Sequence, residues 1–149
     1  MVYFITGLPG VGKTTASKNL GRILESQGRS VIYLDGDNVR KMYPNIGYTK
    51  SARLESCRRV FKLTKMWSDD GHDVIVSIVA PLASTRDMFR RHKFKGGYIE
   101  ILLNEIYQKR PDNYYCHYEA SFIRPELTGR EQLQDFLQKL ERLGKDEQD

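Results

Sequence analysis

Residues 7–14 read GLPGVGKT and match the G-x-x-x-x-G-K-[ST] pattern of a phosphate-binding loop at each fixed position. They stand between the apolar run VYFIT and a helical pattern that begins near Thr14. A strand that turns into a glycine-rich loop and then into a helix points successive backbone N–H groups and a helix N-terminus at one spot. Because that arrangement favours a polyphosphate, the segment predicts a binding site for a nucleoside triphosphate.

Each position of this loop has an expected role. Lys13 reaches the β- and γ-phosphates, and the hydroxyl of Thr14 ligates Mg²⁺. The other interpretation is a glycine-rich turn with no ligand, which the flanking strand and helix patterns disfavour. The predicted nucleotide contacts are Gly7, Gly10, Val11, Gly12, Lys13, Thr14 and Thr15.

A second group of polar residues, LDGDNVR, begins at the end of the apolar run at 31–35. Ligands of open parallel sheets bind beyond the carboxyl ends of the strands, so this segment is expected near the phosphate-binding loop. Asp35 and Asp37 are two carboxylates separated by a flexible glycine, so the pair can hold Mg²⁺ through water, with Asp35 as a predicted ligand, or one member can accept the proton of an attacking hydroxyl. Arg40 follows within reach as an anion clamp. The alternative is that Asp37 or Asn38 merely caps the next short helix.

The elements that must position these residues alternate along the chain. Short apolar runs predict strands at 2–6, 31–35, 73–80 and 98–103. Helical spacing predicts helices from 14 to 28, from 51 to 70, from 84 to 91 and from 130 to 143. Continuously apolar strands separated by helices indicate a parallel sheet covered on both faces. We therefore expect a three-layer α/β/α sandwich of the P-loop nucleoside triphosphatase class, in a single domain over 1–149.

Composition narrows the class of protein. The chain has 149 residues and a formal net charge of +5, which a phosphate-handling enzyme explains without a nucleic-acid partner. Cys57 and Cys116 lie far apart without metal-ligand spacing, which argues against a structural zinc site. No apolar run approaches the roughly 18 residues that span a bilayer, and the first strand leaves no room for a signal peptide. A soluble, cytoplasmic protein is expected.

Several motifs occur in an order that resembles the adenylylsulfate kinase family. They are GLPGVGKTT, then LDGDNVR, then GY with an arginine five residues after the tyrosine, then RR in a long helix, and then a buried strand that ends in VAP. Adenylylsulfate kinases are P-loop enzymes that use ATP and Mg²⁺ to phosphorylate the 3′-hydroxyl of adenosine 5′-phosphosulfate. The resemblance therefore implies phosphoryl transfer to a small nucleotide, and it admits a homodimer.

The resemblance also implies roles for individual residues. Asp37 would act near the accepting hydroxyl and the metal, and Arg40 would bind the anionic end of the acceptor. Tyr48 would stack on the acceptor base, and Arg53 would hold the acceptor's phosphate or sulfate. Arg86, on the helix after the third strand, is a further candidate for acceptor binding.

The chain departs from the family pattern around the acceptor. Ser56 replaces a usual asparagine, and Ala80 replaces a usual serine. A compact segment at about 104–124 replaces the family's long lid, and its Lys109 and Arg110 are either lid cations or a solvated helix end. These changes leave the acceptor open. The alternative within the family is cytidine diphosphoramidate, on which relatives of adenylylsulfate kinase act.

Two alternatives belong to other classes of function. A nucleotide-dependent regulator would bind ATP or GTP without transfer to a small acceptor, but the chain has no NKxD sequence to specify guanine. A polynucleotide kinase would act on DNA or RNA, and its binding would weaken steeply with salt.

Three further residues have expected environments. Arg90 and Arg91 are expected to face solvent. Cys57 is expected to be buried as a small apolar residue, although its neighbours Arg58 and Arg59 could instead lower the pKa of its thiol.

Overall fold

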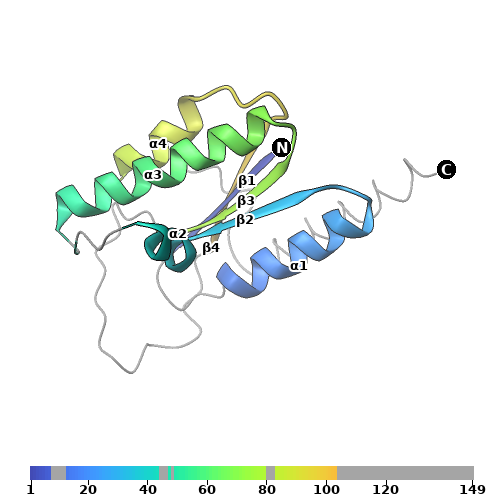
Figure 1. The fold of residues 1–149 in the computed structure, drawn as a ribbon, viewed down its shortest axis with the longest axis horizontal. Coiled ribbons are helices and arrows are strands. Elements are labelled where there is room, and N and C mark those ends of the chain that lie inside the picture. Colours follow the sequence, from blue (N-terminus) through green and yellow to red (C-terminus); the bar gives the residue numbers. More distant parts are fainter. Residues whose placement is uncertain (8–12, 44–46, 48, 80–82, 104–149) are drawn as a thin grey trace.

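The computed structural model describes residues 1–7, 13–43, 47, 49–79 and 83–103 (Figure 1). Within these residues the strands are parallel and form one sheet in the order β2-β3-β1-β4. Val2, at the start of the first strand, pairs with Val74 on one side and with Tyr98 on the other. The carboxyl ends of the strands therefore share one edge of the sheet. The strands are β1 (Val2–Gly7), β2 (Val31–Asp35), β3 (Asp73–Ser77) and β4 (Tyr98–Leu103).

Helices cover both faces of this sheet. Figure 1 shows α3 and α4 on one side, α1 on the other, and α2 beside the end of β2. This arrangement confirms the predicted three-layer α/β/α sandwich. The described helices are α1 (Lys13–Ser26), α2 (Gly36–Met42), α3 (Lys50–Asp69) and α4 (Ala83–Arg91).

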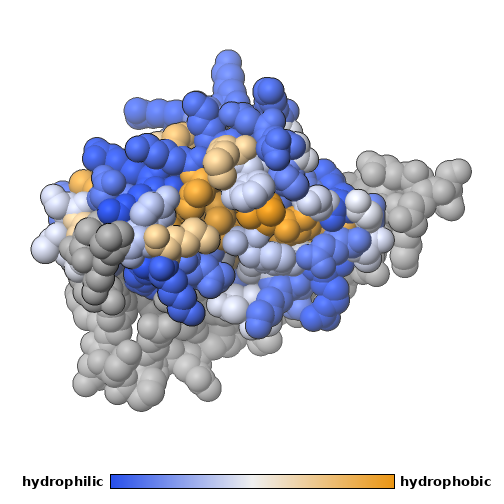
Figure 2. Space-filling model, in the orientation of Figure 1, coloured by the Kyte–Doolittle hydropathy of each residue, from blue (hydrophilic) through white to orange (hydrophobic). Residues whose placement is uncertain are grey.

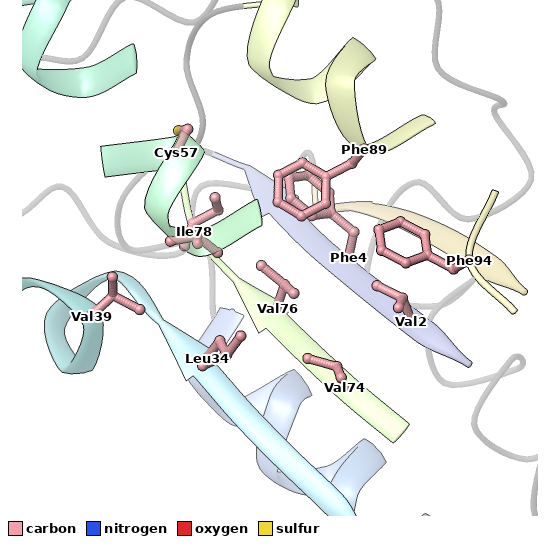
Figure 3. Packing of buried hydrophobic residues seen from close by; sticks show 11 residues of the cluster. Val2, Phe4, Leu34, Val39, Cys57, Val74, Val76, Ile78, Phe89 and Phe94 are labelled. Atoms are coloured by element: carbon pink, nitrogen blue, oxygen red, sulfur yellow. The ribbon is translucent and has the colours of Figure 1, made fainter. Parts of the chain in front are cut away.

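The side chains of β1 alternate between two hydrophobic clusters. Val2 and Phe4 point toward α3 and α4, where the rings of Phe4 and Phe89 have centroids 4.6 Å apart (Figure 3). Tyr3 and Ile5 point to the other face and pack with apolar residues of α1. Burial on both faces explains why the strands read as continuous apolar runs instead of alternating ones.

Glycines end two of the helices, as the sequence predicts for α1. Gly28 has a φ of 80°, its N–H donates to Glu25 O, and the N–H of Arg29 donates to Leu24 O. These two bonds form the Schellman arrangement, in which a left-handed residue satisfies the last carbonyls of a helix. Gly71 repeats it after α3 with a φ of 92°.

Two expectations differ from the structure. The third strand ends at Ser77 instead of 80, although the N–H of Ile78 still donates to Ile5 O. Arg90 does not face solvent: it forms a bidentate ion pair with Glu100 of β4, with Nη2 2.6 Å from Oε2 and Nε 3.0 Å from Oε1. The carboxylate of Glu100 on β4 holds this side chain and leaves it only 23% exposed. The predicted helix at 130–143 and the lid-like segment at 104–124 lie outside the described residues.

One face of the molecule carries a hydrophobic area around the sheet edge formed by β2. Figure 2 shows hydrophobic residues gathered between the α1 and α3 sides, with hydrophilic residues around them. Among the described residues the exposed large hydrophobic side chains are Tyr33, Met42 and Met66. Within the residues that the structure describes, no helix is both long enough and apolar enough to cross a membrane.

Candidate active site

Lys13 folds back toward the end of β1. It is the first residue of α1, and its Nζ donates to the carbonyl of Gly7, the last residue of β1, at 3.2 Å. Gly7 has a φ of 149°, which L side chains rarely adopt, so glycine suits the point where the strand ends. The ammonium group is thus held at the strand edge where the bound phosphates are expected.

The remaining predicted nucleotide contacts divide into two sets. Thr14 and Thr15 lie in the first turn of α1 and are exposed, so their hydroxyls are accessible. Gly10, Val11 and Gly12 lie outside the described residues.

A hydrogen bond ties β1 to the chain that follows β3. The hydroxyl of Thr6 donates to the carbonyl of Val79 at 2.8 Å, and it is fully buried. The carboxyl end of β3 is thereby fixed beside the start of the phosphate-binding loop. Ala80, the next residue, lies outside the described part of the chain.

Asp35 caps α2. Its Oδ1 accepts from the backbone N–H of Asn38 at 2.7 Å, and its Oδ2 accepts from the side-chain amide of Asn38 at 3.0 Å. The cap is therefore Asp35, and the alternative in which Asp37 or Asn38 caps this helix is wrong. The physical reason is that the helix begins one residue after the strand, at Gly36. Each carboxylate oxygen keeps a further lone pair, so capping does not prevent metal binding.

The acidic segment and Arg40 share this short helix. The backbone of Asp37 lies in the first turn of α2, while its side chain is outside the described part of the structure. A Cβ added to Gly36 would lie 3.5 Å from Nη2 of Arg40 and 3.9 Å from Cγ2 of Ile78. The Arg40 guanidinium thus folds back over the start of α2, beside the end of β3.

Arg53 and Arg86 lie on different helices and both influence the thiol of Cys57. Arg86 is fully buried on α4, and Arg53 is half-buried in the second turn of α3. Both guanidinium groups act on the thiol of Cys57, which also has a hydrogen bond with Thr85. Burial nevertheless dominates and raises the pKa of Cys57, so the expected buried environment is confirmed and the lowered pKa is wrong.

Ser56 is half-buried next to Cys57 on α3. Arg53 and Ser56 thus lie on α3, four residues and one residue before Cys57, and Arg86 lies on α4. Tyr48, Lys109 and Arg110 lie outside the described residues, so their roles remain predictions.

Sequence reasoning missed one contact near this site. The guanidinium carbon of Arg59 lies 4.7 Å from the ring centroid of Tyr43, which caps the C-terminal end of α2. The signal was present in the RR pair of the long helix, but nothing in the sequence indicates which arginine turns toward α2.

A hollow of about 520 Å³ lies elsewhere, between α3 and α4. None of the predicted site residues lines it, so it is not the candidate active site. Within the described residues no group of three or more His, Cys, Asp or Glu side chains could hold a metal ion. The lining residues of the hollow are Phe61, Ser84, Asp87, Met88, Arg91 and His92.

Comparison with known proteins gives the context for this geometry. The family model described as "Adenylylsulphate kinase" matches residues 1–134. A relative from Archaeoglobus fulgidus, "Probable adenylyl-sulfate kinase", is 36% identical over 131 residues, which is 86% of this chain and 82% of the relative.

Longer proteins contain a similar segment. "Bifunctional enzyme NodQ" of Rhizobium meliloti is 39% identical over 119 residues, which is 76% of this chain but only 19% of NodQ. The chain thus spans about a fifth of the length of that relative.

A solved structure extends the likeness to three dimensions. The Mycobacterium tuberculosis APS kinase CysC, in complex with AMPPNP and APS, has a TM-score of 0.68 and 25% identity, and the match covers 95% of each chain.

Proposed function

The chain belongs to the adenylylsulphate kinase family, and from that premise we propose that it transfers the γ-phosphoryl group of ATP to the 3′-hydroxyl of adenosine 5′-phosphosulfate. The observation that carries the proposal is the family match over 1–134, since it spans the phosphate-binding loop and the predicted acceptor residues together. The CysC complex with AMPPNP and APS supports it, because that relative holds an ATP analogue and this acceptor in one fold.

The reaction needs little covalent participation from the protein. An oxygen–phosphorus bond forms to the acceptor hydroxyl, the bond between the γ-phosphorus and the bridging oxygen breaks, and ADP leaves. In the proposed mechanism Asp37 accepts the proton of the attacking hydroxyl. Lys13, held at the end of β1 by Gly7 O, compensates charge on the transferring group.

Two residues at the strand ends would hold a magnesium ion in the proposed complex. The Thr14 hydroxyl and the Asp35 carboxylate are the hard oxygen ligands that Mg²⁺ prefers. Asn38 orients the Asp35 carboxylate through two hydrogen bonds, and lone pairs remain for a metal or its water. When bound, Mg²⁺ neutralises charge on the β- and γ-phosphates.

Three arginines would hold the acceptor in the proposed complex. Arg40 and Arg53 would bind its phosphate and sulfate, and the buried Arg86 would reinforce the positive potential from the α4 side. Guanidinium groups suit this task because their fork of donors matches two oxygens of an anion. Tyr48 would stack on the base, and Lys109 and Arg110 would close over the phosphates.

A panel of acceptors tests the proposal. The protein is incubated with ATP, Mg²⁺ and one acceptor, and the product is identified by mass and by the position of the new phosphate. We expect transfer to the 3′-hydroxyl of adenosine 5′-phosphosulfate, with much slower transfer to AMP and to a DNA oligonucleotide. Preferred phosphorylation of cytidine diphosphoramidate would replace the acceptor but keep the reaction. ATP binding without transfer to any of them would instead support a regulator.

We also propose that the protein acts in the cytoplasm as a homodimer. The homodimer rests on the family resemblance, and the cytoplasmic location on the sequence analysis above. Light scattering on the purified protein tests the homodimer directly.

A further inference from the structure

The contact between Arg59 and Tyr43 joins the two helices that carry the proposed acceptor-binding arginines. Arg40 lies on α2, which is only seven residues long, and Arg53 lies on α3. Tyr43 stands at the C-terminal cap of α2, with extended backbone angles of −127° and 154°. The chain leaves α2 at this residue, so an anchor here fixes the end of that helix.

Arg59 is held in place from two directions. Its guanidinium carbon lies 4.7 Å from the Tyr43 ring centroid, and its Nε lies 3.7 Å from Oε1 of Glu55, one turn earlier on α3. The Arg59 side chain is 21% exposed, whereas that of its neighbour Arg58 is 62% exposed and only approaches Glu55 at 4.0 Å. The two adjacent arginines therefore differ in exposure and in contacts: Arg58 is mostly in solvent, whereas Arg59 packs against Tyr43.

The other end of α2 is already fixed. Asp35 caps its start, and Val39 is buried in the hydrophobic cluster with Cys57 and Val60 of α3. Tyr43 is one turn beyond Val39 and packs against the same cluster. The Arg59 contact thus completes a row of attachments along α2, at the end farthest from the sheet.

We propose that Arg59 and Tyr43 are positioning residues that set the separation between Arg40 and Arg53, and thereby adapt the site to an acceptor with two anionic groups. This inference rests on the proposed function, in which Arg40 and Arg53 bind the acceptor. A face-on guanidinium and ring resist sliding of α2 along α3 better than the hydrophobic contact of Val39 alone. Neither positioning residue touches ATP in this account, so its loss affects acceptor binding selectively.

The test compares Michaelis constants for the two substrates. Arg59→Gln and Tyr43→Leu should each raise the KM for adenosine 5′-phosphosulfate by about tenfold and leave the KM for ATP within about twofold. Arg59→Lys and Tyr43→Phe retain a cation and a ring face, so both should stay close to the wild type. The combined variant should be no worse than either single one, because the two residues act as one contact. Arg58→Gln is the matched control and should change neither constant.

Three results would overturn the inference: equal effects of Arg58→Gln and Arg59→Gln, a parallel rise of both Michaelis constants, or additive losses in the combined variant. Thermal midpoints identify variants that have lost their fold. If Arg59→Gln or Tyr43→Leu fails to fold, the Michaelis constants of Arg59→Lys and Tyr43→Phe still test the inference. Arg40→Ala and Arg53→Ala distinguish a failure of the positioning role from a failure of the proposed acceptor site. If those raise the acceptor KM while the Arg59 and Tyr43 variants do not, only the positioning role is wrong. If none raises it, the proposed acceptor site is wrong as well.

Discussion

At the scale of single residues, two charged side chains of the candidate site are held at the ends of strands. Lys13 returns to the carbonyl of Gly7, and Asp35 is oriented by two hydrogen bonds from Asn38. Both side chains are already held in place before a substrate binds, because each forms a hydrogen bond with a backbone group near the end of a strand. Preorganised charge of this kind is the main tool for phosphoryl transfer.

The buried thiol of Cys57 leads to a prediction about pH. Burial raises its pKa above the usual 9.0, so the thiol of the unfolded chain ionises first as the pH rises. Above the pKa of the unfolded thiol, the folded state therefore holds more protons than the unfolded state. The free energy of unfolding should fall as the pH rises from there toward the pKa of the folded thiol. Urea unfolding from about pH 8 to about pH 10 measures the slope.

Cys57→Ala should make that slope shallower without abolishing it. Tyr3 also has a pKa raised by burial and by the nearby Asp73 carboxylate, so it contributes in the same direction at higher pH. An identical slope in the variant and the wild type would show that the thiol does not contribute to it.

At the scale of elements, the helices are placed by their ends. Thr49 begins α3 by accepting from the N–H of Ala52 at 3.1 Å, and Gly71 ends the helix. A helix with both ends fixed presents Arg53 and Arg59 at set heights along its axis. The caps of α3 thus help to set the positions of these two arginines.

Gly28 provides a clean test of this idea at the end of α1. Its φ is 80°, and a Cβ added there would meet nothing within 4 Å, so a substitution strains only the backbone. Gly28→Ala should lower the free energy of unfolding by about 1 kcal/mol, and Gly28→Asn should cost less because asparagine tolerates this conformation. Chemical denaturation of the three proteins gives the comparison. Equal stability of all three would contradict the strain argument.

At the scale of the whole molecule, much of the fold could be predicted from the sequence. The strands read as continuous apolar runs because both faces of the sheet are covered, and GLPGVGKT and LDGDNVR mark the strand ends where polar residues gather. These signals come from residues that are close together in the sequence, so they can be interpreted without knowing which elements pack against one another. The third strand was expected to be longer because its apolar run continues beyond the paired residues.

Contacts between elements could not be predicted in the same way. The pairing of Arg90 with Glu100 depends on α4 lying against β4, and the contact of Arg59 with Tyr43 depends on the approach of α2 to α3. Likewise, three polar residues in LDGDNVR could have capped α2, and only the start of the helix at Gly36 selects Asp35. Each of these details depends on where the elements lie in the folded chain, and composition and periodicity do not give that information.

In the proposed mechanism, a triphosphate site and the acidic segment after β2 act across one edge of the sheet. Asp37→Asn tests it most directly, because asparagine keeps the size of the side chain and removes its capacity as a base. Turnover at saturating ATP and adenosine 5′-phosphosulfate should fall at least about a hundredfold, while calorimetry with a non-hydrolysable ATP analogue should give an affinity within about threefold of the wild type. Asp69→Asn, at the exposed end of α3, is the control and should leave both unchanged. Full turnover in the Asp37 variant would contradict the account.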